Sequence, residues 1–192
     1  MIQPRLEAIS GCMFAGKTRT IIDRIRKFEK EGRRISAIKP LIDDRYGTSD
    51  IVAHDGERVS ATVIGVDDSE SLAGVDVLVL DEAQFLSVGV VDRLIYLLAT
   101  GKINQAVVAG LDLDWRGKPF GQMPRLLCYA DSVVKLHAVC EQCGQPANRS
   151  FLVRRTSVDQ VIQIGGADKY EPRCIPCFEK GMSADNPDVF RP

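Results

Sequence analysis

The sequence lacks the features that would assign a protein to a membrane, to the secretory route or to a nucleic-acid polymer. No apolar run in its 192 residues approaches the ~20 residues that a membrane-spanning helix needs. The opening stretch MIQPRLEAIS has neither a long apolar segment nor a small-residue cleavage site, so no secretory signal is visible. The formal net charge of -1 shows no basic excess of the kind that neutralises nucleic-acid phosphates. We therefore expect a cytoplasmic protein with no membrane contact and no stable nucleic-acid partner.

The composition is that of an ordinary globular protein, with 45% hydrophobic and 27% charged residues and no internal repeat. The length suffices for one sizeable core with a small appended module. Basic residues do gather between Arg24 and Arg34, but apolar residues recur among them at helical spacing. We interpret these charges as the solvated face of a helix and not as a nucleic-acid patch.

Apolar runs alternate with helical patterns in the first part of the chain. Strands are predicted at 6–10, 33–40, 75–82 and 104–111, and helices from near Thr18 to a cap at Gly32 and over 88–100. Strands separated by helices predict an α/β fold with a parallel sheet and helices on both faces. Ligands bind such sheets at the carboxyl ends of the strands, which is where the motifs described below fall.

The residue pattern of the sequence changes near residue 138. Beyond it, cysteine pairs, glycines and the short β-rich runs SFLVRR and QVIQIGG replace the helical periodicity. We predict a nucleotide-binding domain at 1–137, a zinc-binding lid domain at 138–180 and a flexible tail at 181–192.

A phosphate-binding loop is predicted at GCMFAGKT, which has the spacing G-x-x-x-x-G-K-[ST] between a strand and a helix. Glycines let the backbone turn its N–H groups toward a phosphate, and the helix N-terminus adds positive potential. Lys17 would then reach the β- and γ-phosphates, and the Thr18 hydroxyl would bind Mg²⁺. The alternative is a glycine-rich turn that serves only as a helix entry.

Two carboxylates, Asp81 and Glu82, follow the apolar run VLVL. A carboxylate at this strand end suits Mg²⁺, and Asp81 is the candidate. Glu82 points to the other side of the strand and could accept a proton from an attacking hydroxyl. It could equally orient a water molecule, as in a pure ATPase, and these two residues alone leave both options open.

Two C-x-x-C pairs predict a structural zinc site of four thiolates, formed by Cys140, Cys143, Cys174 and Cys177. A disulfide pair is disfavoured in a reducing cytosol, and a redox C-x-x-C needs only one pair. Zinc would pin both ends of the intervening 30 residues, which we predict to form a lid. Cys12 and Cys128 have no partner in sequence, and Cys12, within the loop, is a candidate for alkylation.

Six motifs in order, GCMFAGKT, KPLIDDRYG, VLVLDEAQF, GLDLDWRGKPFG, VCEQCG and IGGADKY with CIPC, resemble the zinc-containing (type II) thymidine kinases of human cytosol and many bacteria. The resemblance covers residues ~5 to 178 and is far more selective than the phosphate loop alone. It implies a RecA-like P-loop NTPase sheet with a small zinc-ribbon-like β domain that carries a lid, or lasso, loop. It also implies ATP-dependent phosphorylation of the thymidine 5′-hydroxyl, with deoxyuridine as a further acceptor, in nucleotide salvage.

The resemblance also implies roles for individual residues. Glu82 would be the general base, and Arg45 would offset charge on the transferring phosphoryl group, unless it forms a surface ion pair with Asp43 or Asp44. Residues expected to contact ATP or Mg²⁺ are Gly11, Met13, Phe14, Ala15, Gly16, Lys17, Thr18, Asp43, Asp81 and Gln84. Residues expected to contact thymidine are Met13, Leu111, Trp115, Phe120, Val161, Gln163, Gly165 and Tyr170.

Some of these assignments have a structural alternative. Leu111 and Phe120 could be plain core residues, whereas Tyr170, between a diglycine and a cysteine pair, has little core to join. Cys12, Ala15, Trp115 and Ser150 depart from residues common in the family, which affects the volume of the pocket and no catalytic group.

The resemblance further implies a homotetramer and feedback inhibition by thymidine triphosphate. Two other classes compete with it. The DEAQ segment resembles the acidic motif of helicases, although these couple two sheet domains and this chain has room for one. A non-catalytic zinc-ribbon adaptor that merely binds nucleotide is the other, and the presence of Lys17, Asp81 and Glu82 argues against it.

Overall fold

A computed structural model describes residues 5–41, 50–53, 56–72, 74–153 and 165–185. Its centre is a six-stranded sheet in the order β5-β2-β6-β7-β1-β8, in which every pairing is parallel. The strands are β1 (Leu6–Ser10), β2 (Ile35–Pro40), β5 (Thr62–Ile64), β6 (Val77–Leu80), β7 (Gln105–Gly110) and β8 (Ser132–Lys135). The predicted parallel sheet is thus confirmed.

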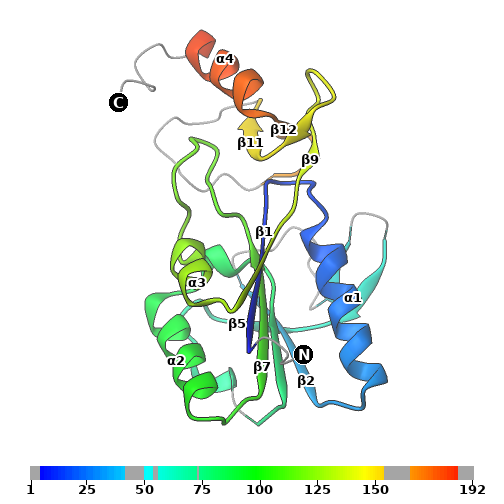
Figure 1. The fold of residues 1–192 in the computed structure, drawn as a ribbon, viewed down its shortest axis with the longest axis vertical. Coiled ribbons are helices and arrows are strands. Elements are labelled where there is room, and N and C mark those ends of the chain that lie inside the picture. Colours follow the sequence, from blue (N-terminus) through cyan, green and yellow to red (C-terminus); the bar gives the residue numbers. More distant parts are fainter. Residues whose placement is uncertain (1–4, 42–49, 54–55, 73, 154–164, 186–192) are drawn as a thin grey trace.

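Helices cover both faces of this sheet (Figure 1). One face carries α1 (Lys17–Lys30), and the other carries α2 (Val88–Ala99) and α3 (Met123–Tyr129). Short 3₁₀ turns occur at η1 (Glu70–Leu72) and η2 (Ala83–Phe85). Within the described ranges, no helix combines the length and the apolar character needed to cross a bilayer.

The amphipathic pattern of α1 explains its position. Ile21, Ile22, Ile25 and Phe28 are buried against the sheet, and the basic side chains occupy the outer face, as predicted. The helix ends at Lys30, and Gly32 follows with φ of 70°, a left-handed conformation that favours glycine.

Several short elements carry too few residues for a periodic pattern, and the sequence did not reveal them. The hairpin of β3 (Asp50–Val52) and β4 (Arg58–Ser60) is one. Glu57, just before β4, forms ion pairs with Arg19 and Arg26 of α1, which attach the hairpin to the helix.

The second unit lies beyond the carboxyl ends of the sheet strands (Figure 1). It consists of two antiparallel pairs, β9 (Ala138–Val139) with β10 (Pro146–Ala147) and β11 (Arg149–Leu152) with β12 (Tyr170–Arg173), followed by α4 (Ile175–Asp185). Helix α4 includes residues 181–185, which we assigned to the tail, and the rest of that tail lies outside the described residues.

The core packing of α1 gives a stability prediction. Phe28→Ala removes a side chain that is 2% exposed, and it should lower the free energy of unfolding by about 3–5 kcal/mol because a cavity remains. Lys30→Ala on the exposed face of the same helix is the control and should change it by less than about 0.5 kcal/mol. Urea unfolding followed by circular dichroism measures both, and equal effects would contradict this orientation of α1.

Candidate active site

The phosphate loop connects β1 to α1 and is tightly turned. Phe14 and Gly16 have positive φ angles of 64° and 85°. Gly11 lies so close to the chain after β8 that a Cβ would stand 2.6 Å from the carbonyl oxygen of Leu136. Glycine at position 11 is therefore required by close packing, and the loop has the compact shape that a phosphate-binding backbone needs.

Lys17 opens α1 and turns its ammonium group back over this loop. Its Nζ donates a hydrogen bond to the carbonyl oxygen of Cys12 at 2.8 Å, and the side chain is buried. Burial lowers the pKa of Lys17 below its usual value, while the negative charges of Glu82 and Asp81 act in the opposite direction. The ammonium group of Lys17 and the carboxylates of Asp81 and Glu82 therefore lie near enough to interact electrostatically.

Asp81 and Glu82 follow β6 directly. The buried Asp81 accepts the backbone N–H of Glu82 on Oδ1 at 2.9 Å, which closes a tight local turn. Glu82 has φ of 52° and ψ of 39°, a left-handed conformation that costs an L-residue about 1–2 kcal/mol. Backbone strain of this kind is concentrated at functional sites, and here it occurs at a carboxylate that acts on Lys17.

Gln84, which we expected among the ATP contacts, is hydrogen-bonded to Glu82. Its Nε2 donates to Glu82 Oε2 at 2.5 Å, and its Oε1 accepts the backbone N–H of Leu111 at 3.0 Å. The side chain is 3% exposed. Both ends of the Gln84 amide are therefore hydrogen-bonded to protein groups.

Asp112 is a member of this site that the sequence reasoning missed. Its carboxylate is buried, forms an ion pair with Lys135 Nζ at 2.8 Å, and contributes to the field around Lys17. The sequence did contain a signal for this residue, because Asp112 stands two positions beyond the buried strand β7, much as Asp81 directly follows the buried strand β6.

The residues expected at the nucleoside fall into two groups. Trp115 and Tyr170 share an apolar cluster, and Met13 of the phosphate loop packs against it. Phe120 lies elsewhere, edge-on to Phe85 of η2 with ring centroids 5.5 Å apart. Met13 therefore connects the phosphate loop to the second unit through Trp115 and Tyr170. Phe85 and Phe120 instead lie beside the segment that carries Asp81 and Glu82.

The premise that Tyr170 has little core to join is wrong. It is 9% exposed and packs with Phe151, Phe178 and Met182, side chains that sequence reasoning did not single out. A small hydrophobic core exists here because α4 covers β11 and β12, and α4 was not predicted. Arg45 and Asp43, together with Val161 and Gln163, lie outside the described residues. Gly165 begins the turn that leads into β12.

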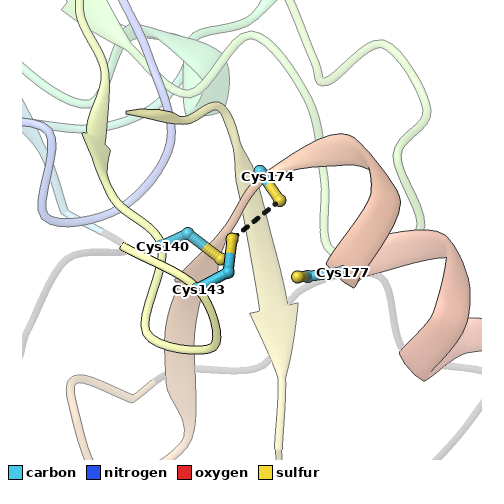
Figure 2. Close-up of side chains that lie close together, drawn as sticks. All are labelled: Cys140, Cys143, Cys174 and Cys177. Carbon is cyan, nitrogen blue, oxygen red and sulfur yellow. Dashed lines mark hydrogen bonds between the residues drawn. The ribbon is translucent and has the colours of Figure 1, made fainter. Parts of the chain in front are cut away.

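The four predicted cysteine ligands come together at one point (Figure 2). Their sulfur atoms all lie within 4.8 Å of one another, and Cys143 Sγ and Cys174 Sγ are 3.5 Å apart. Tetrahedral zinc with Zn–S bonds of ~2.3 Å places sulfur atoms ~3.8 Å apart, so this arrangement fits a zinc ion. All four thiols are free, which excludes disulfides among them.

Cys140 and Cys143 belong to the turn between β9 and β10, whereas Cys174 and Cys177 stand at the start of α4. Although burial opposes it, hydrogen bonds from the backbone N–H groups of Cys174, Gln142 and Cys143 lower the pKa of Cys140 to about 6. These donors favour the thiolate form of Cys140, which is the form that binds metal, whereas hydrogen bonding with Cys174 raises the pKa of Cys177 to about 12.

The phosphate loop is attached directly to this cysteine unit. Cys12 packs against Cys140 and Cys174, and its Sγ donates to the carbonyl oxygen of Ala147 at 3.4 Å. The backbone N–H of Met13 donates to Ser150 Oγ at 2.9 Å. Burial raises the pKa of the Cys12 thiol, and the residue is 2% exposed, so the expected alkylation is disfavoured by both its access and its thiolate content.

Comparison with known proteins agrees with this geometry. The thymidine kinase family model matches residues 4–178. A thymidine kinase of Bacteroides fragilis (strain YCH46) is 40% identical over 94% of this chain and 90% of its own length. Those of Porphyromonas gingivalis (strain W83) and Coprothermobacter proteolyticus are 41% and 42% identical, covering 93% and 88% of this chain and 86% and 87% of their own. The chain therefore belongs to the thymidine kinase family.

Proposed function

We propose that this enzyme transfers the γ-phosphate of ATP to the 5′-hydroxyl of thymidine, with Glu82 as the general base. The observation that carries the proposal is the meeting of Lys17 and Glu82 in one site, the lysine from the phosphate loop and the carboxylate from the end of β6. A kinase needs a cation for the transferring phosphate and a base for the attacking hydroxyl.

In the proposed reaction, the Glu82 carboxylate takes the proton of the 5′-hydroxyl as its oxygen attacks the γ-phosphorus. The bond between that phosphorus and the β–γ bridging oxygen breaks, and ADP leaves. Lys17 would neutralise charge on the phosphate oxygens, and we assign the same role to Arg45.

Mg²⁺ would help to neutralise the triphosphate, held by the Thr18 hydroxyl and the Asp81 carboxylate. An all-oxygen donor set suits this ion. The zinc ion, by contrast, would be structural, since four thiolates leave no open position for a substrate.

Met13, Trp115 and Tyr170 are our candidates for the pocket around the base, together with Leu111, Phe120 and Gly165 and with Val161 and Gln163 of the lid. Acceptance of deoxyuridine, a homotetrameric state, feedback by thymidine triphosphate and a cytoplasmic location also stay proposals. The helicase alternative finds no support, because the matching family and relatives are kinases.

A coupled assay tests the acceptor. ADP release should require ATP, Mg²⁺ and thymidine together, and deoxyuridine should replace thymidine in part. Deoxycytidine, deoxyadenosine and deoxyguanosine should give only background, because their exocyclic amines would remain unpaired in a site built for thymine. ADP release that rises with single-stranded DNA and ignores nucleosides would contradict the proposal.

Replacement of the proposed base tests its role. Glu82→Gln keeps an oxygen that can accept the Gln84 hydrogen bond but removes the proton acceptor, so kcat should fall about 10²-fold or more while ATP affinity is retained. Steady-state kinetics and calorimetric titration of a non-hydrolysable ATP analogue measure the two quantities. Glu70→Gln, at an exposed carboxylate, is the control. Normal turnover in Glu82→Gln would reject the assignment.

The contact between the cysteine unit and the phosphate loop predicts that metal loss weakens ATP binding. Cys143→Ser should lower the zinc content measured by plasma mass spectrometry, lower the melting temperature, and raise the Kd for the ATP analogue about tenfold. Loss of the hydrogen bonds to Ala147 and Ser150, at ~1 kcal/mol each, would account for this change.

Cys128→Ser is the matched control, because Cys128 is an exposed cysteine of α3 outside the quartet. The parent protein should contain about one zinc ion per chain. If removal of that zinc leaves the ATP affinity unchanged, the phosphate loop does not depend on the metal.

A further inference from the structure

Gln84 connects two groups that belong to different strands. The Glu82 carboxylate follows β6, and the Leu111 N–H follows β7. The polarity of both bonds is fixed by chemistry, because a carboxylate can only accept and a backbone N–H can only donate. The amide therefore has one orientation in which both bonds form, with Nε2 toward Glu82 and Oε1 toward Leu111.

The surroundings of Gln84 are shaped to hold it. Gly110 ends β7 without a positive φ, yet a Cβ there would stand 2.4 Å from Gln84 Oε1. Gly121, with φ of 52°, comes so close that a Cβ would stand 1.8 Å from the Gln84 carbonyl oxygen. Both positions thus leave room for Gln84 only because they are glycine.

Glu82 needs such a restraint for an electrostatic reason. Its carboxylate is the first of the charges that act on the buried Lys17 ammonium, so attraction draws the two groups together. An ion pair between them would occupy the base and the phosphate-binding cation at once. The hydrogen bond from the buried Gln84 amide opposes that movement, because Nε2 competes with the ammonium group for the carboxylate.

We propose that Gln84 is a positioning residue that holds the Glu82 carboxylate in place for proton transfer and ties it to the backbone of Leu111. The inference rests on the proposed role of Glu82 as the base. Gln84 itself need not touch either substrate. It acts through Glu82, and its loss should therefore affect turnover more than binding.

The central experiment compares Gln84→Leu with the parent. Misplacement of a base by ~1 Å can cost about 10²-fold in rate, so kcat should fall between about 10- and 100-fold, with the KM values for ATP and thymidine changed less than about threefold. Gly110→Ala should likewise lower kcat with little change in KM, because the added methyl group displaces the amide oxygen of Gln84. Met123→Leu is the control for disturbed packing beside Gly110, and it should leave kinetics unchanged because it nearly conserves volume.

A double-mutant cycle separates positioning from a merely structural role. In the Glu82→Gln background, Gln84→Leu should cost less than about threefold in kcat, because the group that Gln84 positions is already inactive. An undiminished loss in that background, a kcat unchanged in Gln84→Leu, or a rise in KM without a fall in kcat would each overturn the proposal.

The same cycle keeps the two hypotheses apart. If Glu82→Gln lowers kcat and Gln84→Leu does not, the base assignment stands and the positioning role fails. If Glu82→Gln has no effect, the base assignment itself fails and the positioning role with it. Should Gln84→Leu not fold, Gln84→Met serves instead, because it keeps the length of the side chain and adds no charge but cannot donate to Glu82. It too should lower kcat with little change in KM, and an unchanged kcat would refute the role.

Discussion

The position of β7 between β6 and β1 is the constraint on which the site depends. The carboxylates follow β6 and the phosphate loop follows β1, so the two can meet only across the end of the strand that separates them. That strand ends in Gly110, where no side chain blocks the space taken by Gln84. A parallel arrangement brings all three strand ends to the same edge, and a small residue at the middle one lets the flanking groups approach each other.

The second unit contacts the phosphate loop at the carboxyl edge of the sheet and restrains it there. The phosphate loop is held on one side by its own helix and on the other by hydrogen bonds to Ala147 and Ser150, residues of the unit that carries the cysteine quartet. The zinc ion that we propose for the four thiolates would fix the local backbone, since such a site forms only in the folded state. The proposed metal site would therefore support the shape of the phosphate loop, which contacts this unit at Ala147 and Ser150.

The sequence predicted those parts whose signals are local. The loop glycines, the helix end at Gly32, the buried runs and the cysteine pairs each follow from neighbours in the chain, and each is where it was expected. The role of Gln84, the burial of Tyr170 and the ion pair of Asp112 with Lys135 depend on side chains brought together by the fold. A single sequence holds no spacing rule for such contacts, and three-residue strands such as β3 and β4 are too short to show a period.

The left-handed backbone at position 82 limits how the protein can be stabilised. Glycine adopts this conformation without the steric penalty that glutamate bears, so a chain selected for thermal tolerance alone would gain by discarding its carboxylate there. With Glu82 as the proposed base, its left-handed backbone lowers stability at the position where the carboxylate is needed. Attempts to make the enzyme hardier by relaxing backbone strain should therefore leave this residue alone and begin at turns remote from the carboxyl edge of the sheet.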